Sequence, residues 1–587
     1  MSDFNKYSRR RFLRDSSIGL LAFAGAPSVL RAMEGMGSMG GMQAMPKMTP
    51  NRASANFKPD VELELFCKST SVSILPGEQT RVQQYSAKLL QGPPDTLTEI
   101  KGSYLGPVLR LQKGQKVRIH LHNQLAEPTV THWHGLHVPA NMDGHPLYAI
   151  DPGEKLVYEF EVLNRASMNI YHPHPHETTA KQVYHGLAGA LFVHDQEEAA
   201  LELPSGEYEI PIVIQDRVFD EQNQLIYVRN MHDRMTGFYG DRILVNGRPD
   251  FHIDVASRAY RLRVLNGSTA RIYKLAWDDG TPITVIGVDG GLLEKPETKP
   301  YVMLAPGERL DVWADFSGRG EGSQLVMRSL AFSGVLPKMG MMMHSGSLPV
   351  GSDYPIFTAR VTRKVSDSPK LPTTLSTINW HKISDTANPE KPVPIGITEG
   401  HMSMVLNGRP YAYNDIQDIE RIRVNTIQLM EIFHAHGGGG GHGNSSAAPE
   451  EQGEEQQSGG MMGGMGMGGM RHGRGMGGMR HGTMGGMGGM GGGMGGMGMM
   501  MSMAHPIHLH GQSFQIVSRS IDADSDDDYA SVREGFIESG LKDTVLVMPG
   551  EKVRIIKPFQ DFKGLFMYHC HNLEHEDMGM MRDFSVE

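Results

Sequence analysis

The run of residues around Cys570 constrains the fold more than any other part of the sequence. His569 and His571 flank this cysteine, and His575 and Met580 follow it at positions +5 and +10. Apolar and aromatic side chains alternate before it, which indicates a β-strand whose successive side chains point to opposite faces. Cys570 therefore faces one way and its two neighbours the other. With one more histidine, Cys570, His575 and Met580 complete the ligand set of a blue-copper electron-transfer site.

Three other His-x-His pairs accompany this run. Each pair presents two imidazoles from one face of a strand, so the four pairs offer eight nitrogen ligands, enough for three copper ions with two or three each. A single pair on a half-buried strand is usually surface decoration, but four pairs, one of them flanking a cysteine, exclude that interpretation. His505 remains as the second histidine for the cysteine site. The other pairs are His132/His134, His172/His174 and His508/His510.

These motifs resemble those of the three-domain multicopper oxidases. Within that family the chain is most similar to the bacterial copper efflux oxidases (cuprous oxidases), the laccases and the bilirubin oxidases. The resemblance runs from about Phe57 to the C-terminus. One departure is Ile170, which precedes Tyr171 where the family often has tryptophan, two residues before the second pair.

The resemblance implies four copper ions and assigns a ligand set to each type. A type 1 copper would be held by His505, Cys570, His575 and Met580. A type 2 copper would be held by His132 and His508. The type 3 pair would take His134, His172, His174, His510, His569 and His571.

An internal repeat predicts the architecture. A Pro-Gly-Glu turn followed by alternating apolar residues begins at Pro152, Pro306 and Pro549, and such turn-then-strand units are typical of β-proteins. We therefore predict an all-β chain of three Greek-key β-sandwich domains, which the resemblance identifies as cupredoxin-like. The copper motifs fall only in the first and third, so the middle domain is expected to be a spacer that also shapes the substrate side. The predicted domains are 57–198, 199–366 and 395–587.

The length and composition narrow the class of protein. The 587 residues suffice for three or four domains, and the formal net charge of −10 argues against a nucleic-acid partner. There are only two cysteines. Because Cys570 is assigned to copper, Cys67 has no disulfide partner and is expected to be reduced in an early strand. Stability must then come from apolar cores and bound metals, and we expect a monomer.

The N-terminus predicts export. Arg9 and Arg10 precede Phe12 and a mildly apolar run over residues 18–30, a pattern typical of a twin-arginine signal, which we place at 1–32. The alternative, a basic amphipathic helix of the mature protein, is disfavoured by the glycines and proline in that run. The run is too short to span a membrane after cleavage. We expect the twin-arginine export machinery as a partner and a periplasmic location, with a Met/Gly-rich leader over 33–56.

A Met/His/Gly-rich insert occupies residues 434–503 of the third domain, in a chain with 41 Met and 71 Gly. A flexible, disordered linker would explain the glycine. It would not explain the methionine, whose thioether is a soft ligand that prefers Cu(I). Both ends of the insert should emerge beside His505. Met501 stands where the efflux enzymes have a carboxylate for substrate copper, so Met501 and Met503 are the candidate substrate-copper ligands.

The resemblance also suggests how oxygen is reduced. Cys570, His569 and His571 would carry electrons to the cluster, and Asp143 and Glu576 match acidic positions that deliver protons in the efflux oxidases. The alternative for both carboxylates is an ordinary surface position. We expect an exported oxidase that couples oxidation of Cu(I), and of phenols, to reduction of dioxygen to water and so serves copper tolerance. The alternatives are a laccase or bilirubin-oxidase-like enzyme acting on organic substrates, and a non-catalytic copper-sequestering protein.

Overall fold

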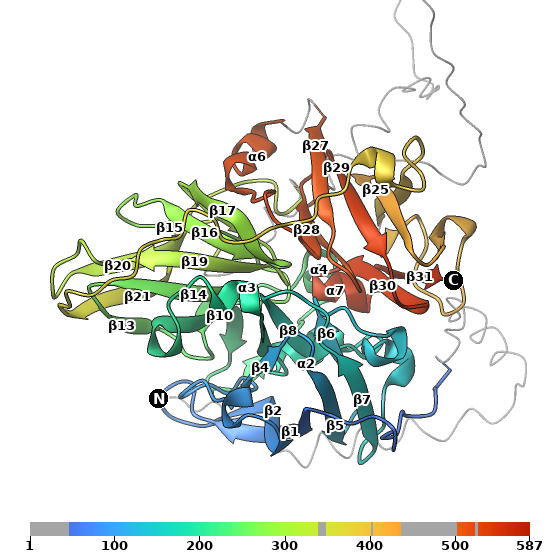
Figure 1. Cartoon of the computed structure of the whole chain (residues 1–587), viewed down its shortest axis with the longest axis horizontal. Coiled ribbons are helices and arrows are strands. Elements are labelled where there is room, and N and C mark those ends of the chain that lie inside the picture. The colour runs from blue at the N-terminus through green and yellow to red at the C-terminus, as the bar shows by residue number, and fades with distance from the viewer. Residues whose placement is uncertain (1–45, 338–347, 401–402, 436–501, 523–525) are drawn as a thin grey trace, which may run out of the picture. The chain divides into compact units, whose positions relative to one another are not determined.

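Strands make up nearly all of the regular structure in the computed structural model, and the all-β prediction is confirmed (Figure 1). The predicted signal segment and almost all of the insert lie outside the described residues, so the predictions about them remain predictions. Among the described helices, none is long and apolar enough to cross a membrane. The structure describes residues 46–337, 348–400, 403–435, 502–522 and 526–587.

The first third of the described chain forms two sheets, with strand orders β2-β1-β5-β7 and β3-β4-β9-β8-β6. Between them lies one apolar core, to which β1 contributes Val61, Leu63, Leu65 and the free, buried Cys67. The expectation for Cys67 is therefore confirmed. The elements are β1 (Val61–Val72), β2 (Thr80–Gln91), η1 (Pro94–Thr96), β3 (Leu97–Thr98), β4 (Val108–Gln112), β5 (Lys116–Gln124), β6 (Thr131–His134), η2 (Ala140–Met142), η3 (Pro146–Tyr148), β7 (Lys155–Glu161), β8 (Ser167–Pro173), α2 (Thr179–Tyr184), β9 (Gly189–His194) and α3 (Gln196–Ala199).

The middle third repeats this plan with its own apolar core. One sheet has the order β11-β10-β14-β19-β16-β17, with β12 also paired to β10, and the other has the order β13-β21-β20-β15-β18. The elements are η4 (Gly206–Tyr208), β10 (Glu209–Phe219), β11 (Leu225–Ile226), α4 (Met231–Thr236), β12 (Arg242–Val245), β13 (His252–Ala256), β14 (Ala259–Asn266), β15 (Tyr273–Trp277), β16 (Ile283–Val288), β17 (Gly291–Lys299), β18 (Val302–Leu304), β19 (Arg309–Asp315), β20 (Gln324–Ser329) and β21 (Tyr354–Arg363).

The last third again forms two sheets, with orders β23-β22-β25-β29-β27 and β24-β31-β30-β26-β28. Its core includes Cys570 and Met580. The elements are η6 (Ile383–Asp385), β22 (Val393–Gly400), β23 (Ser403–Leu406), η7 (Asp418–Glu420), β24 (Arg421–Ile422), β25 (Thr426–His434), β26 (His505–Leu509), β27 (Gln515–Ile521), α6 (Asp526–Ala530), η9 (Arg533–Gly535), β28 (Thr544–Val547), β29 (Glu551–Phe559), β30 (Gly564–Cys570), α7 (Leu573–Asp577) and β31 (Met581–Val586).

The three Pro-Gly-Glu turns lead into equivalent strands. In each third a first strand pairs in parallel with a second, as β1 with β5, β10 with β14 and β22 with β25. The second strand then pairs antiparallel with the strand that follows the turn, which is β7, β19 or β29. The sequence repeat therefore marks a repeated fold, and the turn-then-strand prediction is confirmed at all three positions.

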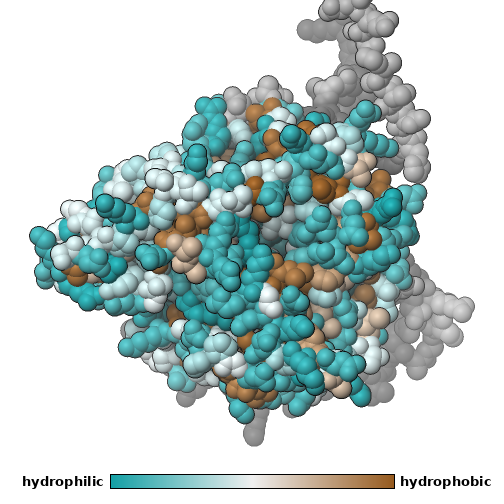
Figure 2. Space-filling view, in the orientation of Figure 1, coloured by the Kyte–Doolittle hydropathy of each residue, from teal (hydrophilic) through white to brown (hydrophobic). Residues whose placement is uncertain are grey.

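The face of the molecule drawn in Figure 2 is mostly hydrophilic, with apolar residues in small scattered groups. This distribution is ordinary for a protein surface. Large apolar side chains that are well exposed among the described residues include Met48, Leu90, Met231 and Trp380. They lie in separate stretches of the chain, so apolar surface does not locate a functional site.

Candidate metal centres

Two antiparallel strand pairs bring the histidine pairs together. The register of β6 and β8 places His132 opposite His172, and the register of β26 and β30 places His508 opposite His569. Directly opposed residues have their Cβ atoms only about 5 Å apart. The local alternation of each strand then aims the second histidine of each pair to the same side. We call the resulting set the imidazole cluster: His132, His134, His172, His174, His508, His510, His569 and His571.

The imidazole cluster divides into groups that could each hold one metal ion. The ligand atoms of His134, His172 and His571 lie within 4.8 Å of one another, and so do those of His174, His510 and His569. His132 and His508 remain, with ring centroids 5.7 Å apart. Ligand atoms of His132, His134 and His508 also lie within 4.8 Å of one another, so one His-x-His pair can share a group. The members of the other three pairs fall in different groups: His172/His174, His508/His510 and His569/His571.

The buried ring nitrogens fit metal ions. Nε2 of His132, His172 and His508 and Nδ1 of His134 have no hydrogen-bond partner among the described residues, although the rings are buried. Nε2 of His569 lies 3.2 Å from Nε2 of His510. Burial lowers the pKa of His508 to about 3, so its imidazole is neutral at pH 7, the form that binds metals. Buried polar atoms without partners are costly, and a coordinated ion would satisfy these nitrogens.

The opposite ring nitrogens are held by oxygen atoms, which decides which nitrogen faces the interior of the cluster. His132 donates from Nδ1 to the carbonyl of Asp143 at 2.6 Å, and His510 donates from Nδ1 to the Asp143 carboxylate at 2.7 Å. His172 donates from Nδ1 to the carbonyl of Pro173 at 2.8 Å. Partners of this kind orient metal-binding imidazoles and set their tautomer.

Both carboxylates proposed for proton delivery are 2% exposed, so the surface alternative is wrong for each. Glu576 Oε2 lies 3.1 Å from His569 Nδ1, and its Oε1 lies 3.6 Å from His174 Nε2. Burial acts to raise the pKa of Glu576, but these two imidazoles outweigh it and lower the pKa to about 2. Burial raises the pKa of Asp143 above its usual value. The two carboxylates therefore flank the imidazole cluster in different charge environments.

The second candidate site surrounds Cys570 and is called the sulfur pocket: His505, Cys570, His575 and Met580. The Cys570 sulfur lies 3.4 Å from His505 Nδ1 and 3.7 Å from His575 Nδ1. The Cys570 amide donates to the Met580 carbonyl at 3.0 Å, and the Met580 side chain is fully buried. Burial raises the pKa of the Cys570 thiol, so it needs a bound metal to become the thiolate ligand.

Strand β30 joins the two sites. Cys570 belongs to the sulfur pocket, while its neighbours His569 and His571 belong to two different groups of the imidazole cluster. The predicted strand is confirmed, and its alternation sends the thiol and the imidazoles to opposite faces. One peptide bond therefore joins Cys570, in the candidate electron-transfer site, to His569 in one candidate metal group, and another joins it to His571 in a second group.

The described residues at both ends of the insert lie beside the sulfur pocket, as predicted. The His434 ring centroid lies 5.8 Å from that of His505, and Ser502 Oγ lies 3.0 Å from His434 Nδ1. Met503 is 1% exposed and packs in the same apolar core as Cys570. Met501 lies outside the described residues.

Glu399 was not predicted, yet it contacts a candidate ligand. Its Oε1 accepts hydrogen bonds from His505 Nε2 at 3.0 Å and from the Met503 amide at 2.7 Å. The His434 and His505 hydrogen bonds overcome burial and lower the pKa of Glu399 far below its usual value. Glu399 lies near the end of β22, more than one hundred residues before His505, and no spacing relates the two. The two residues belong to different sheets of the last third, so only the packing of those sheets brings them together.

The middle third contacts both sites. It was predicted to be a spacer that also shapes the substrate side, and its contact with the imidazole cluster goes beyond that prediction. His575 donates from Nε2 to the carbonyl of Met235 at 3.0 Å. Arg309 donates to the carboxylate of Asp543, and that carboxylate accepts from His134 Nε2 at 2.9 Å. Neither Asp543 nor Arg309 carries a motif that marks it as part of a metal site, although Arg309 lies within the second Pro-Gly-Glu repeat.

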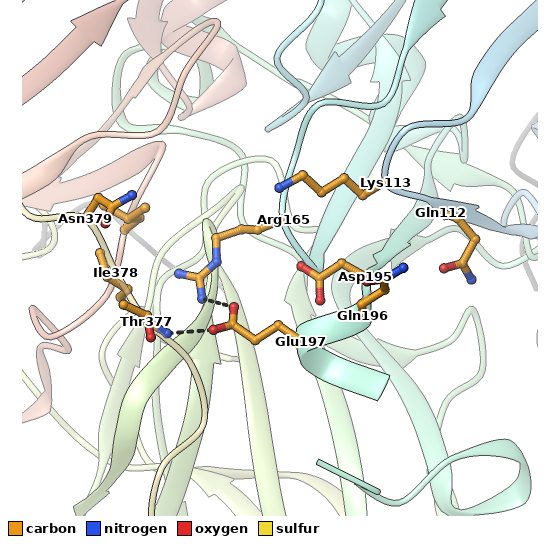
Figure 3. A pocket seen from close by; sticks show the side chains of 10 residues that line it. Gln112, Lys113, Arg165, Asp195, Gln196, Glu197, Thr377, Ile378 and Asn379 are labelled. Atoms are coloured by element: carbon orange, nitrogen blue, oxygen red, sulfur yellow. Dashed lines mark hydrogen bonds and ion pairs between the residues drawn. The ribbon is translucent and has the colours of Figure 1, made fainter. Parts of the chain in front are cut away.

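One pocket between the first third, the middle third and the following linker lies apart from these ligands. It has a volume of about 760 Å³, and none of its lining residues belongs to the imidazole cluster or the sulfur pocket. In Figure 3, Arg165 and Thr377 both approach Glu197, with distances of 3.5 Å for the ion pair and 2.8 Å for the amide hydrogen bond. Because these polar groups satisfy one another, the pocket does not indicate a substrate site.

Comparisons with known proteins agree with this geometry. Multicopper oxidase family models match residues 81–198 and 495–587. The chain is 27% identical to the multicopper oxidase mco of Staphylococcus aureus over 506 residues, which cover 86% of this chain and 87% of the relative. It is 28% identical over 554 residues to a laccase of Bacillus stratosphericus, covering 84% and 91% respectively.

A solved structure extends the match to the whole fold. The crystal structure of the McoA multicopper oxidase 2F4 variant from the hyperthermophile Aquifex aeolicus superimposes with a TM-score of 0.67 and 27% identity, covering 93% of this chain and 100% of that one. The expected cupredoxin-like architecture is thereby confirmed. The family models, these relatives and the similar fold all belong to multicopper oxidases, so these are the proteins that the chain resembles.

Proposed function

We propose that this protein is an exported oxidase that couples one-electron oxidation of Cu(I) to four-electron reduction of dioxygen to water. The proposal rests on one arrangement. Strand β30 joins the sulfur pocket to the imidazole cluster, in which several buried ring nitrogens have no hydrogen-bond partner among the described residues. Bound copper would supply one-electron storage at four positions. The sulfur pocket would hold type 1 copper, His132 with His508 type 2 copper, and the two remaining groups of three imidazoles the type 3 pair.

The protein's own residues would then divide the work. Cys570 would be a ligand of the type 1 copper, and its peptide bonds to His569 and His571 would link it covalently to both type 3 groups. Protons must reach the same place, because oxygen becomes water only if protons arrive with the electrons. Asp143 and Glu576 are buried against imidazoles of the cluster, Asp143 beside His510 and Glu576 beside His569. We assign them the role of holding and passing these protons.

Cu(I) is favoured over organic reductants by what surrounds His505. Its Nε2 atom donates to a buried, charged carboxylate, and the ends of a methionine-rich insert lie next to it. Carboxylate and thioether together suit a copper ion better than a neutral phenol. Met501 and Met503 stay the candidate substrate ligands, and Met503, which is buried, would have to move to reach a substrate ion. A role in copper tolerance follows from removing Cu(I).

The second candidate is a laccase-like enzyme, and the similarity to a bacterial laccase favours it. Oxygen uptake with Cu(I) or with a phenol as the sole reductant separates the two. The cuprous oxidase predicts a higher kcat/KM for Cu(I). A clear preference for the phenol would reject it. A protein that binds copper but consumes no oxygen with either reductant would instead be a sequestering protein.

Export through the twin-arginine route to the periplasm is part of the proposal. Changing Arg9 and Arg10 together to lysine should leave a folded, active protein in the cytoplasm, because the signal depends on the arginine pair. Fractionation of cells followed by oxidase staining measures this. The proposed route is wrong if the double variant reaches the periplasm as efficiently as the unchanged chain.

A further inference from the structure

The turn at residues 305–309 of the middle third packs directly against the imidazole cluster. Gly307 has φ +80°, and a Cβ added there would lie 2.9 Å from atoms of the His571 ring. Real Cβ atoms do not approach other atoms so closely. The backbone of this turn therefore forms one wall of the space that holds His571, although the middle third supplies no member of the cluster.

Arg309, at the end of the same turn, links all three thirds of the chain. Its side chain is fully buried, and its five N–H donors, the full number a guanidinium has, match the five acceptors around it. The acceptors are the Met168 carbonyl at 2.9 Å, the Gly307 carbonyl at 2.9 Å, the Asp289 carbonyl at 3.1 Å and the two Asp543 carboxylate oxygens at 2.7 and 2.5 Å. Such a paired, planar contact fixes the Asp543 carboxylate in position and orientation.

Asp543 transmits this constraint to two candidate ligands. Its carboxylate accepts from His134 Nε2 at 2.9 Å, and its carbonyl accepts from His508 Nδ1 at 2.9 Å. The His134 and His508 rings stack with centroids 3.7 Å apart. Each ring therefore keeps its other nitrogen, Nδ1 of His134 and Nε2 of His508, unpartnered and available to a metal.

The other copies of the repeat do not make these contacts. Gly153, in the first copy, has φ +84° but nothing within 4 Å of an added Cβ. The residues equivalent to Arg309 are Lys155 and Lys552, and both are exposed. Gly153 and Gly307 share the same turn conformation, so the turn does not by itself require the contacts that Gly307 and Arg309 make with the residues around the imidazole cluster.

We propose that the 305–309 turn of the middle third is a positioning element for the trinuclear copper site, acting on His571 through Gly307 and on His134 and His508 through Arg309 and Asp543. The inference rests on the copper assignment made under the proposed function. Arg309 touches no reacting atom. Its role is to hold the ligands in the geometry in which they bind metal, as residues behind metal ligands generally do.

Two matched pairs of variants test this in the full-length, copper-loaded protein. Gly307→Ala and Gly153→Ala impose the same backbone strain, but only the first adds a Cβ against His571. Arg309→Lys and Arg261→Lys each remove the bidentate contact between a buried arginine of the middle third and an aspartate, which is Asp543 or Asp311 respectively. Arg261 donates to Asp311 on β19 at 2.9 Å and contacts no residue of the imidazole cluster.

The measurements are copper per chain after challenge with a chelator, the EPR spectrum of the type 2 copper, the blue absorption of the type 1 copper and the thermal midpoint. Gly307→Ala and Arg309→Lys should lose trinuclear copper 10- to 100-fold more readily and alter the type 2 spectrum. Their type 1 absorption should stay unchanged. Gly153→Ala and Arg261→Lys should lower the thermal midpoint without changing either spectrum.

The positioning role is overturned if Gly307→Ala and Arg309→Lys keep the unchanged type 2 spectrum and copper retention. It is equally overturned if the two control variants alter the type 2 spectrum to the same extent. If Arg309→Lys does not fold, the glycine pair still decides the question. An unchanged chain that binds no trinuclear copper would reject the proposed function itself, which is a different result.

Discussion

The sulfur pocket and the imidazole cluster are built in opposite ways. Three of the four members of the sulfur pocket lie between residues 570 and 580, on one strand, one short helix and the turn after it, and His505 comes from the adjacent strand β26. The imidazole cluster takes four members from the first third and four from the last, and the middle third braces it through Arg309. One site is therefore mostly local, and the other exists only when three regions dock.

The two sites also differ in their surroundings. Cys570 and Met580 lie in an apolar core, whereas Asp143, Glu576 and Asp543 contact the imidazole cluster. An electron-transfer site benefits from a shell that excludes water, while a site that reduces oxygen needs groups that carry protons. The sulfur pocket has one such carboxylate, Glu399, against three at the imidazole cluster, and this difference parallels the proposed division between electron entry and oxygen reduction.

The largest expected effect comes from a change on β30, the strand that the two sites share. Cys570→Ser should abolish the blue colour and all oxidase activity, because a serine hydroxyl is too weak a donor to replace the thiolate. The EPR signal of type 2 copper should remain, since the imidazole cluster does not include the thiol. Cys67→Ser, at the other buried thiol, is the control and should keep colour and activity. A Cys570→Ser protein that stays blue would reject the type 1 assignment.

The next effect is confined to the imidazole cluster. Glu576→Gln keeps the size of the side chain but cannot release a proton, so kcat for oxygen reduction should fall about 10²- to 10⁴-fold with the blue colour unchanged. Oxygen uptake under saturating reductant measures this. Glu574→Gln, two residues earlier on α7, is the control because Glu574 contacts Tyr227 rather than the imidazole cluster. Equal losses in both variants would indicate a structural effect.

A smaller effect concerns access to the sulfur pocket. Replacing residues 437–499 by a short Gly/Ser linker leaves every candidate copper ligand in place, so the four coppers and the blue colour should survive. Loss of thioether ligands should lower kcat/KM for Cu(I) about tenfold, equivalent to about 1.4 kcal/mol, while kcat/KM for a phenol holds or rises. Unchanged Cu(I) oxidation would favour the laccase-like function. A parallel fall with both reductants would mean that the insert supports the fold around His505.

The smallest expected effect concerns the reduction potential of the sulfur pocket. Glu399→Gln removes a negative charge from the carboxylate that accepts from His505, which destabilises the more positive, oxidised copper. The type 1 reduction potential should therefore rise, by about 60 mV or less, which is the shift for a tenfold change in a one-electron equilibrium. A redox titration of the blue absorption measures it. Glu431→Gln on β25, where the carboxylate pairs with Arg554, should leave the potential unchanged. A potential that does not move would show that Glu399 is electrostatically uncoupled from the site.

Much of the fold and the membership of both sites could be predicted from the sequence. The alternation of a strand is local, so the spacing of His569, Cys570 and His571 alone determines that the thiol faces away from its neighbours. The Pro-Gly-Glu repeat likewise predicted three equivalent strand arrangements, because a few neighbouring residues are enough to determine the conformation of a turn. His-x-His pairs could be assigned to the cluster without knowing how the strands pack.

The sequence alone did not reveal how the six histidines assigned to the type 3 pair divide between two ions, nor the contacts of Glu399, Asp543 and Arg309 with the candidate ligands. His134 and His571 are separated by more than four hundred residues, and their proximity depends on how the first and last thirds dock. Arg309 sits in the same repeat as the exposed Lys155, and only burial between three regions turns its charge into a structural contact. Side-chain direction follows from local backbone geometry, whereas the partner that a side chain meets follows from packing between distant segments, and only the tertiary structure decides that.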